Sequence, residues 1–157
     1  MKRTIFYLSV FAVIGLILTG CGGKKDPAAQ TDVAEANASY GGLTKFEFEN
    51  GIGPVKEKMN LSAVSAENAL KGEKIFEQKC FSCHRLDTKL VGPALGEVTK
   101  RRSPEFIVNM IMNPDEMTKK HPVAKQLLAE YLVAMPFQDI TLDDAKLLLE
   151  YLRSAAK

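Results

Sequence analysis

Several residue types are scarce in this chain of 157 residues, and each scarcity narrows what the protein can be. Tryptophan is absent, the two histidines are His84 and His121, and the three cysteines are Cys21, Cys80 and Cys83. A zinc site that takes four nitrogen or sulfur ligands is therefore difficult to assemble. No Ser/His/Asp set, phosphate-binding glycine loop or paired-carboxylate signature stands out in the sequence.

The chain also has no large excess of charge of either sign. The formal net charge is +2, from 21 basic and 19 acidic residues. Lys2 and Arg3 account for the excess, so the chain that follows them is formally neutral. Nucleic-acid binding needs a net basic face, so the charge balance argues against a nucleic-acid partner.

The first residues have the layout of a signal peptide. Lys2 and Arg3 precede an apolar run of 14 residues (5–18), and small residues lead up to Cys21. The run is shorter than the roughly 20 residues that span a bilayer. Its end resembles a lipoprotein box. This resemblance implies removal of residues 1–20, lipidation of Cys21 and attachment to the periplasmic side of a bacterial membrane, inner or outer. An uncleaved membrane helix and a secretory leader with an incidental cysteine are the alternatives.

Two segments separate the leader from the helical part of the chain. Residues 21–40 have almost no large apolar side chains and are interpreted as a flexible linker. Residues 41–64, the N-terminal extension, have no assigned role. Within the extension, the alternation Phe46-Glu47-Phe48-Glu49 before Asn50-Gly51 is typical of a half-buried strand, which predicts an extended segment packed on the domain.

The domain expected at residues 65–157 is helical. Ser65 is a candidate cap for a helix over residues 66–79, in which Gly72 indicates close approach of another backbone. Ser103-Pro104 opens a second helix, which Asn113-Pro114 ends. His121-Pro122 begins a third, and Thr141 begins the last. The stripe expected on the first helix consists of Leu70, Ile75 and Phe76.

The most informative motif is Cys80-Phe81-Ser82-Cys83-His84. This C-x-x-C-H spacing indicates attachment of a c-type haem. Two thiols three positions apart on a helical turn can reach the vinyl groups on one edge of a porphyrin, and the adjacent histidine then lies beneath the iron. A redox dithiol and a zinc site are the alternatives. The loop Val91–Gly96 is close enough in sequence to supply a carbonyl that orients the His84 ring.

A second axial ligand would decide what the iron does. The candidates are Met59, Met110, Met112, Met117, Met135 and His121. Met110 and Met112 fall inside a predicted helix and are interpreted as core, and His121 is interpreted as a surface residue at a helix start. Met135 is favoured, because it precedes Pro136 in a loop between two helices.

Residues 66–155 resemble a bacterial class I monohaem cytochrome c. The matching motifs are C-x-x-C-H, Gly92-Pro93-x-Leu95, Asn113-Pro114, Met135-Pro136 and Leu149-Glu150-Tyr151-Leu152. The resemblance implies an all-α bundle of about four helices around one covalent haem c. It also implies thioether bonds at Cys80 and Cys83, and iron ligation by His84 and Met135. Pro93 would offer its carbonyl to the His84 ring, and Gly72 and Phe76 would pack against Tyr151.

The chain departs from the family pattern in two places. It lacks the tryptophan that contacts a haem propionate in relatives, a role that Arg101 or Arg102 could take, and the segment 114–135 is long.

The expected function is electron transfer rather than catalysis. The expected partners are redox proteins such as an oxidase, a reductase or a quinol-oxidising complex. Five basic residues near the motif could steer acidic partners: Lys71, Lys74, Lys79, Arg85 and Lys89. The alternatives are a haem enzyme with an open distal side, such as a peroxidase or a small-oxyanion reductase, and a small-ligand sensor.

Overall fold

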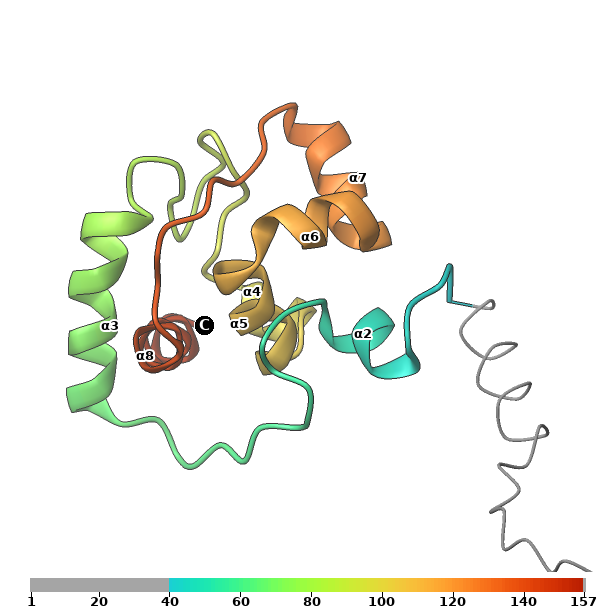
Figure 1. Cartoon of the computed structure of the whole chain (residues 1–157). Coiled ribbons are helices and arrows are strands. Elements are labelled where there is room, and N and C mark those ends of the chain that lie inside the picture. The colour runs from blue at the N-terminus through green and yellow to red at the C-terminus, as the bar shows by residue number, and fades with distance from the viewer. Residues whose placement is uncertain (1–39, 157) are drawn as a thin grey trace, which may run out of the picture.

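The computed structural model describes residues 40–156, and every regular element in that range is a helix. Cys21, the leader and nearly all of the linker lie outside the described residues. Within the described range, no helix is long and apolar enough to cross a membrane. Figure 1 shows the arrangement of the seven helices found in residues 40–156, which are α2 (Lys45–Asn50), α3 (Ala66–Lys79), α4 (Val98–Arg101), α5 (Pro104–Met112), α6 (Pro114–Lys120), α7 (Pro122–Tyr131) and α8 (Leu142–Ala155).

The helix starts follow the capping residues in the sequence. The side chain of Ser65 accepts the backbone N–H of Asn68 at the start of α3. Ser103 and Thr141 cap α5 and α8 in the same way. Each hydroxyl satisfies a backbone donor that the first turn of a helix leaves unpaired. These three predicted starts are confirmed.

Helices α3 and α8 cross in close contact. In Figure 1, α8 is seen end-on and α3 is seen from the side, so the two helix axes cross at a steep angle. The crossing point is Gly72, where an added Cβ would lie 2.0 Å from the carbonyl oxygen of Leu147. The Phe76 and Tyr151 rings pack nearby, with centroids 5.3 Å apart. The close backbone approach predicted at Gly72 is confirmed, but Leu70 is 60% exposed and does not join the core.

The described residues form two apolar clusters. The first lies between α3, α5 and α8 and contains Phe76, Ile107, Val108, Ile140, Ala145, Leu148, Leu149 and Leu152. The second joins the N-terminal extension and the residues just before it to α5, α6 and α7, and contains Leu43, Ile52, Phe106, Met117 and Ala124. The extension therefore packs on the helical body.

The strand expected at Phe46–Glu49 is wrong, because these residues lie in α2. Thr44 and Glu47 form a capping box, in which each side chain bonds the other residue's backbone N–H. The local hydrogen bonds of this box favour a helix, and they outweigh the alternating pattern. Gly51, at φ +82°, ends the helix.

In residues 113–122, the predicted end of α5 is confirmed and the predicted surface position of His121 is wrong. Asn113-Pro114 ends α5 as predicted, but Pro114 also begins α6, because proline fits the first turn of a helix. His121 is 1% exposed rather than a surface residue. Its Nε2 donates to the Phe48 carbonyl at 3.0 Å, and its Nδ1 accepts the Val123 N–H at 3.2 Å. The ring thus caps α7 and holds the extension against it.

Candidate functional site

The C-x-x-C-H motif forms a helical turn at the end of α3. The N–H of Cys80 donates to the Phe76 carbonyl at 2.8 Å, which continues the helical pattern past Lys79. The N–H groups of Cys83 and His84 then donate to the Cys80 carbonyl at 3.0 and 2.9 Å. This turn brings the two thiols and the imidazole to one end of α3, as the motif spacing predicts.

A neighbouring loop fixes the imidazole. The Nδ1 of His84 lies 2.9 Å from the Pro93 carbonyl oxygen. A carbonyl only accepts hydrogen bonds, so Nδ1 carries the proton, and the unprotonated Nε2 of a neutral ring is free to bind a metal. The loop is held in place by backbone pairs such as Gly92 N–H to Cys83 oxygen at 2.9 Å.

In this loop, position 92 has room only for a glycine. An added Cβ there would lie 2.4 Å from Cε1 of His84. Its backbone conformation is ordinary, so the requirement is space for the imidazole rather than backbone freedom. The motif Gly92-Pro93-x-Leu95 contains this glycine, but no pattern in the sequence indicates its contact with the His84 ring.

His84 opens onto a largely apolar cavity of about 480 Å³. Cys80, Cys83 and Pro93 line it together with His84, and Met135 lines it from the loop between α7 and α8. Its other walls come from α5, α7 and α8, through residues such as Ile107, Met110, Leu128 and Leu148. A cavity of this size and character suits a large flat apolar cofactor.

The environment of Cys80 argues against a redox dithiol. Burial, together with the nearby Cys83, raises the pKa of the Cys80 thiol to about 11. Redox-active C-x-x-C pairs instead carry a thiol with a lowered pKa, because the thiolate is the reactive form. The zinc alternative also gains no support, because residues 40–156 bring together no group of three His, Cys, Asp or Glu residues that could hold a metal ion.

Known proteins with a similar sequence and fold identify the family of this chain. The cytochrome c family model matches residues 69–156. Cytochrome c from Rhodothermus marinus is 43% identical, with a TM-score of 0.67, over 70% of this chain and 95% of that chain. The chain belongs to the cytochrome c family. An engineered Rhodothermus marinus cytochrome c bound to a carbene intermediate is also 43% identical, with a TM-score of 0.64, over 70% of this chain and 96% of that chain.

The similarity extends beyond the family model. Seventy per cent of 157 residues is about 110, which is more than the stretch 69–156 contains. Cytochrome c2 from Rhodopseudomonas palustris is 44% identical over 45 residues, or 29% of this chain and 32% of that protein. The chain therefore matches about a third of the length of this curated relative.

As a cytochrome c, the protein binds haem c covalently, and Cys80 and Cys83 are the thiol pair of its C-x-x-C-H motif. The residues present fit this group. The thiols and the oriented imidazole adjoin the apolar cavity, and cationic side chains also line it, including Arg101 and Arg102. These two arginines could pair with the haem carboxylates. Arg101 already donates to the Ala94 carbonyl at 2.9 Å, and the Arg102 guanidinium lies 5.3 Å from the Phe106 ring centroid.

The structure separates the candidates for a second axial ligand. Met135 and Met110 both line the cavity. Met117 is fully buried in the second cluster, where its sulfur lies 3.0 Å from the Ile52 N–H. Both ring nitrogens of His121 are engaged elsewhere. Met59 and Met112 pack against the first cluster.

Proposed function

We propose that this cytochrome c is a one-electron carrier in which His84 and Met135 ligate the haem iron. The observation that supports this proposal is that both side chains line the same apolar cavity beside Cys80 and Cys83. Bound haem supplies an iron that gains and loses single electrons. Ligation by methionine and histidine raises the reduction potential and leaves no open position for a substrate.

Each protein residue has a defined part in this proposal. Cys80 and Cys83 fix the porphyrin edge at the end of α3. Pro93 holds the proton of His84 on Nδ1, which directs Nε2 toward the metal. Met135 is favoured over Met110, because Met110 belongs to α5 and packs against the second cluster. Met135 instead lies half-buried in a loop.

A pair of matched variants tests this ligation. Met135→Leu in the haem-loaded protein removes the thioether with little change in volume, and Met110→Leu does the same at another position on the cavity wall. We expect the Met135 variant to lose the thioether-to-iron charge-transfer band, to bind carbon monoxide when reduced and to have a lower reduction potential. The Met110 variant should keep all three properties of the parent. The reverse result would assign the iron to Met110, and a parent protein that binds carbon monoxide readily would favour a haem enzyme.

A redox protein with an acidic docking face is the partner we propose. Val91 and Val133 line the cavity and are 41% and 53% exposed, and Lys79 and Lys89 line it as well. Of the other basic residues near the motif, Lys71 pairs with Glu67 at 2.7 Å, and Arg85 stacks over Phe81. Steering by these charges predicts that electron-transfer rates with a physiological partner fall as ionic strength rises. Rates that do not depend on salt would exclude steering.

We also propose that Cys21 carries a lipid anchor on the periplasmic side of a bacterial membrane. The signal-peptide layout and the small residues before Cys21 support this proposal. Expression of the full chain in a bacterium that processes lipoproteins should place the protein in the membrane fraction. Cys21→Ala should release it from that fraction, and intact mass spectrometry should find acyl groups only on the parent.

A further inference from the structure

Helix α5 carries different chemistry on two of its faces. Phe106, Ile107, Met110 and Ile111 line the haem cavity. Glu105 and Asn109 instead bond the N-terminal extension, as does Asn113 just after the helix. These three residues, here called the polar stripe, are spaced four apart and so form one line along the helix. Glu105 and Asn109 are 2% and 0% exposed.

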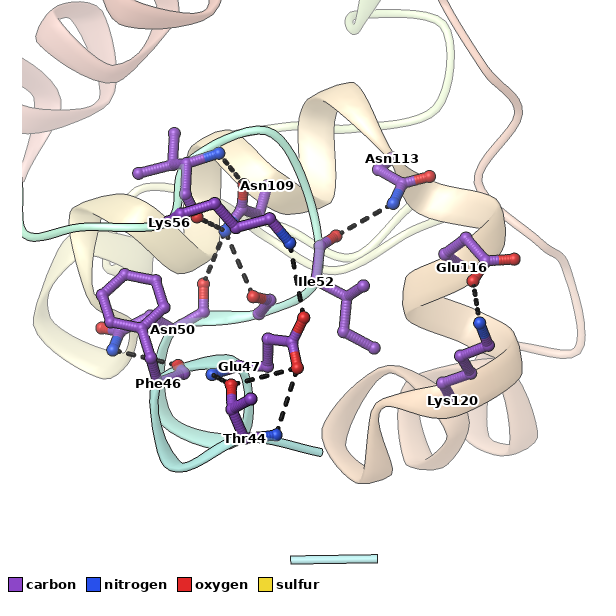
Figure 2. A network of polar contacts seen from close by, with 12 residues as sticks. Thr44, Phe46, Glu47, Asn50, Ile52, Lys56, Asn109, Asn113, Glu116 and Lys120 are labelled. Atoms are coloured by element: carbon purple, nitrogen blue, oxygen red, sulfur yellow. Dashed lines mark hydrogen bonds and ion pairs between the residues drawn. The ribbon is translucent and has the colours of Figure 1, made fainter. Parts of the chain in front are cut away.

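Asn109 is the centre of the polar stripe. Its Oδ1 accepts the Val55 N–H at 2.9 Å. Its Nδ2 donates to the carbonyls of Asn50, Gly51 and Val55 at 3.0, 3.2 and 3.0 Å. Figure 2 shows hydrogen bonds between this side chain and the backbone of the extension. One amide, with two N–H donors and one acceptor oxygen, thus lies within hydrogen-bond distance of four backbone groups of a segment that has no strand partner within the described residues.

Glycine allows this close contact. An added Cβ at Gly53 would lie 2.4 Å from Oδ1 of Asn109. At Gly51 the backbone has φ +82°, and an added Cβ would lie 3.1 Å from the Met117 side chain. The glycines at positions 51 and 53 therefore leave room for side chains that pack here, including that of Asn109, which lies more than 50 residues later in the chain.

The rest of the polar stripe extends the same contact. Oε1 of Glu105 accepts the Met59 N–H at 2.8 Å, and its Oε2 lies 3.3 Å from Lys58 Nζ. Asn113 Nδ2 donates to the Ile52 carbonyl at 3.1 Å, as Figure 2 shows. Backbone groups between residues 50 and 59 are therefore bonded to α5 and to the residue after it.

We propose that Asn109 is a positioning residue for the haem site. By fixing the extension behind α5, it holds the opposite face of α5 as a rigid wall of the cavity. This inference rests on the proposed haem site and adds a role for the extension. Loss of the amide leaves buried backbone groups without partners, which costs more than the loss of a hydrogen bond exposed to water. The wall should then open locally below the temperature at which the whole protein unfolds.

Asn109→Leu in the full, haem-loaded chain tests this role. The matched control is Gly72→Ala, which loosens the α3–α8 crossing but leaves the polar stripe intact. We expect the Asn109 variant to exchange the amide hydrogens of α5 and α6 at least about tenfold faster than the parent. On heating, it should also lose its thioether-to-iron charge-transfer band at a lower temperature than its helical circular-dichroism signal. Gly72→Ala should lose both signals together, at one melting temperature.

The possible outcomes separate this inference from the ligation proposal. The two variants could instead lose the same amount of melting temperature, with no faster amide hydrogen exchange confined to α5 and α6. That result would show that Asn109 has only a structural role. Should Asn109→Leu fail to fold, Asn113→Leu removes a single hydrogen bond of the polar stripe and takes its place with the same expected pattern. A parent protein without the charge-transfer band would overturn Met135 ligation. The exchange measurement would still decide the role of Asn109.

Discussion

Replacing Gly72 with alanine at the α3–α8 crossing has two opposite effects on the stability of the protein. Helix propensity alone favours alanine over glycine inside a helix by about 1 kcal/mol. Sterically, the added Cβ would lie 2.0 Å from the Leu147 carbonyl oxygen and 3.0 Å from Cβ of Tyr151. A backbone carbonyl within a helix cannot rotate away as a side chain would, so the two helices must move apart.

The steric effect should prevail. Overpacking of a well-packed core costs about 1–3 kcal/mol and sometimes more. Because the atom met here is main chain, we place the cost at about 3 kcal/mol. After the gain in helix propensity, Gly72→Ala should lower the free energy of unfolding by about 2 kcal/mol.

Urea unfolding of the haem-loaded protein, followed by circular dichroism, measures this change. Leu70→Ala is the control, because it lies in the same helix with its side chain 60% exposed and should cost less than about 1 kcal/mol. A Gly72→Ala protein as stable as the parent, or more stable, would refute the close-contact argument and leave helix propensity in control.

Three further predictions follow from individual residues. Gly92→Ala should displace the His84 ring, cost about 1–3 kcal/mol and convert part of the iron to a high-spin form visible in the optical spectrum. Leu132→Gly should raise the free energy of unfolding by about 0.5 kcal/mol in urea, because Leu132 caps α7 at φ +58° and is 83% exposed. Burial, with a smaller effect of Arg102, lowers the pKa of His121, so this residue stabilises the fold fully above the unfolded pKa of about 6.5. That stability should be lost as pH falls from about 6.5 through the pKa of His121 in the folded protein. In the His121→Asn variant, the melting temperature should therefore depend less on pH than in the parent.

The helices that sequence analysis predicted well are those whose starts depend on local chemistry. Ser65, Ser103 and Thr141 each bond an N–H three residues ahead, so a few adjacent residues determine where α3, α5 and α8 begin. The haem-binding turn is equally local, because all of its residues lie between Cys80 and His84.

Errors arose where one local signal had two interpretations. Phe46–Glu49 alternates like a strand, but Thr44 and Glu47 cap a helix there. Pro114 ends α5 as predicted, but it also starts α6, which the same signal does not reveal. The burial of His121 depends on Phe48, which is 73 residues away. No local pattern contains such a contact, although the polar spacing of the stripe at 105, 109 and 113 within an apolar helix was a usable signal of a second buried face.

The cavity and the extension solve related problems of a small helical protein. An apolar space of about 480 Å³, if closed and unfilled, would cost on the order of 10 kcal/mol at the cavity cost measured in protein cores, which is comparable with the whole stability of a domain. Haem c is therefore part of the core, and the attachment to Cys80 and Cys83 that we propose would keep that core in place. Because α5 faces the haem on one side, its other side needs a partner that cannot slide. The hydrogen bonds of Asn109 to the main chain of the extension provide that fixed contact, since they specify position as apolar packing alone does not.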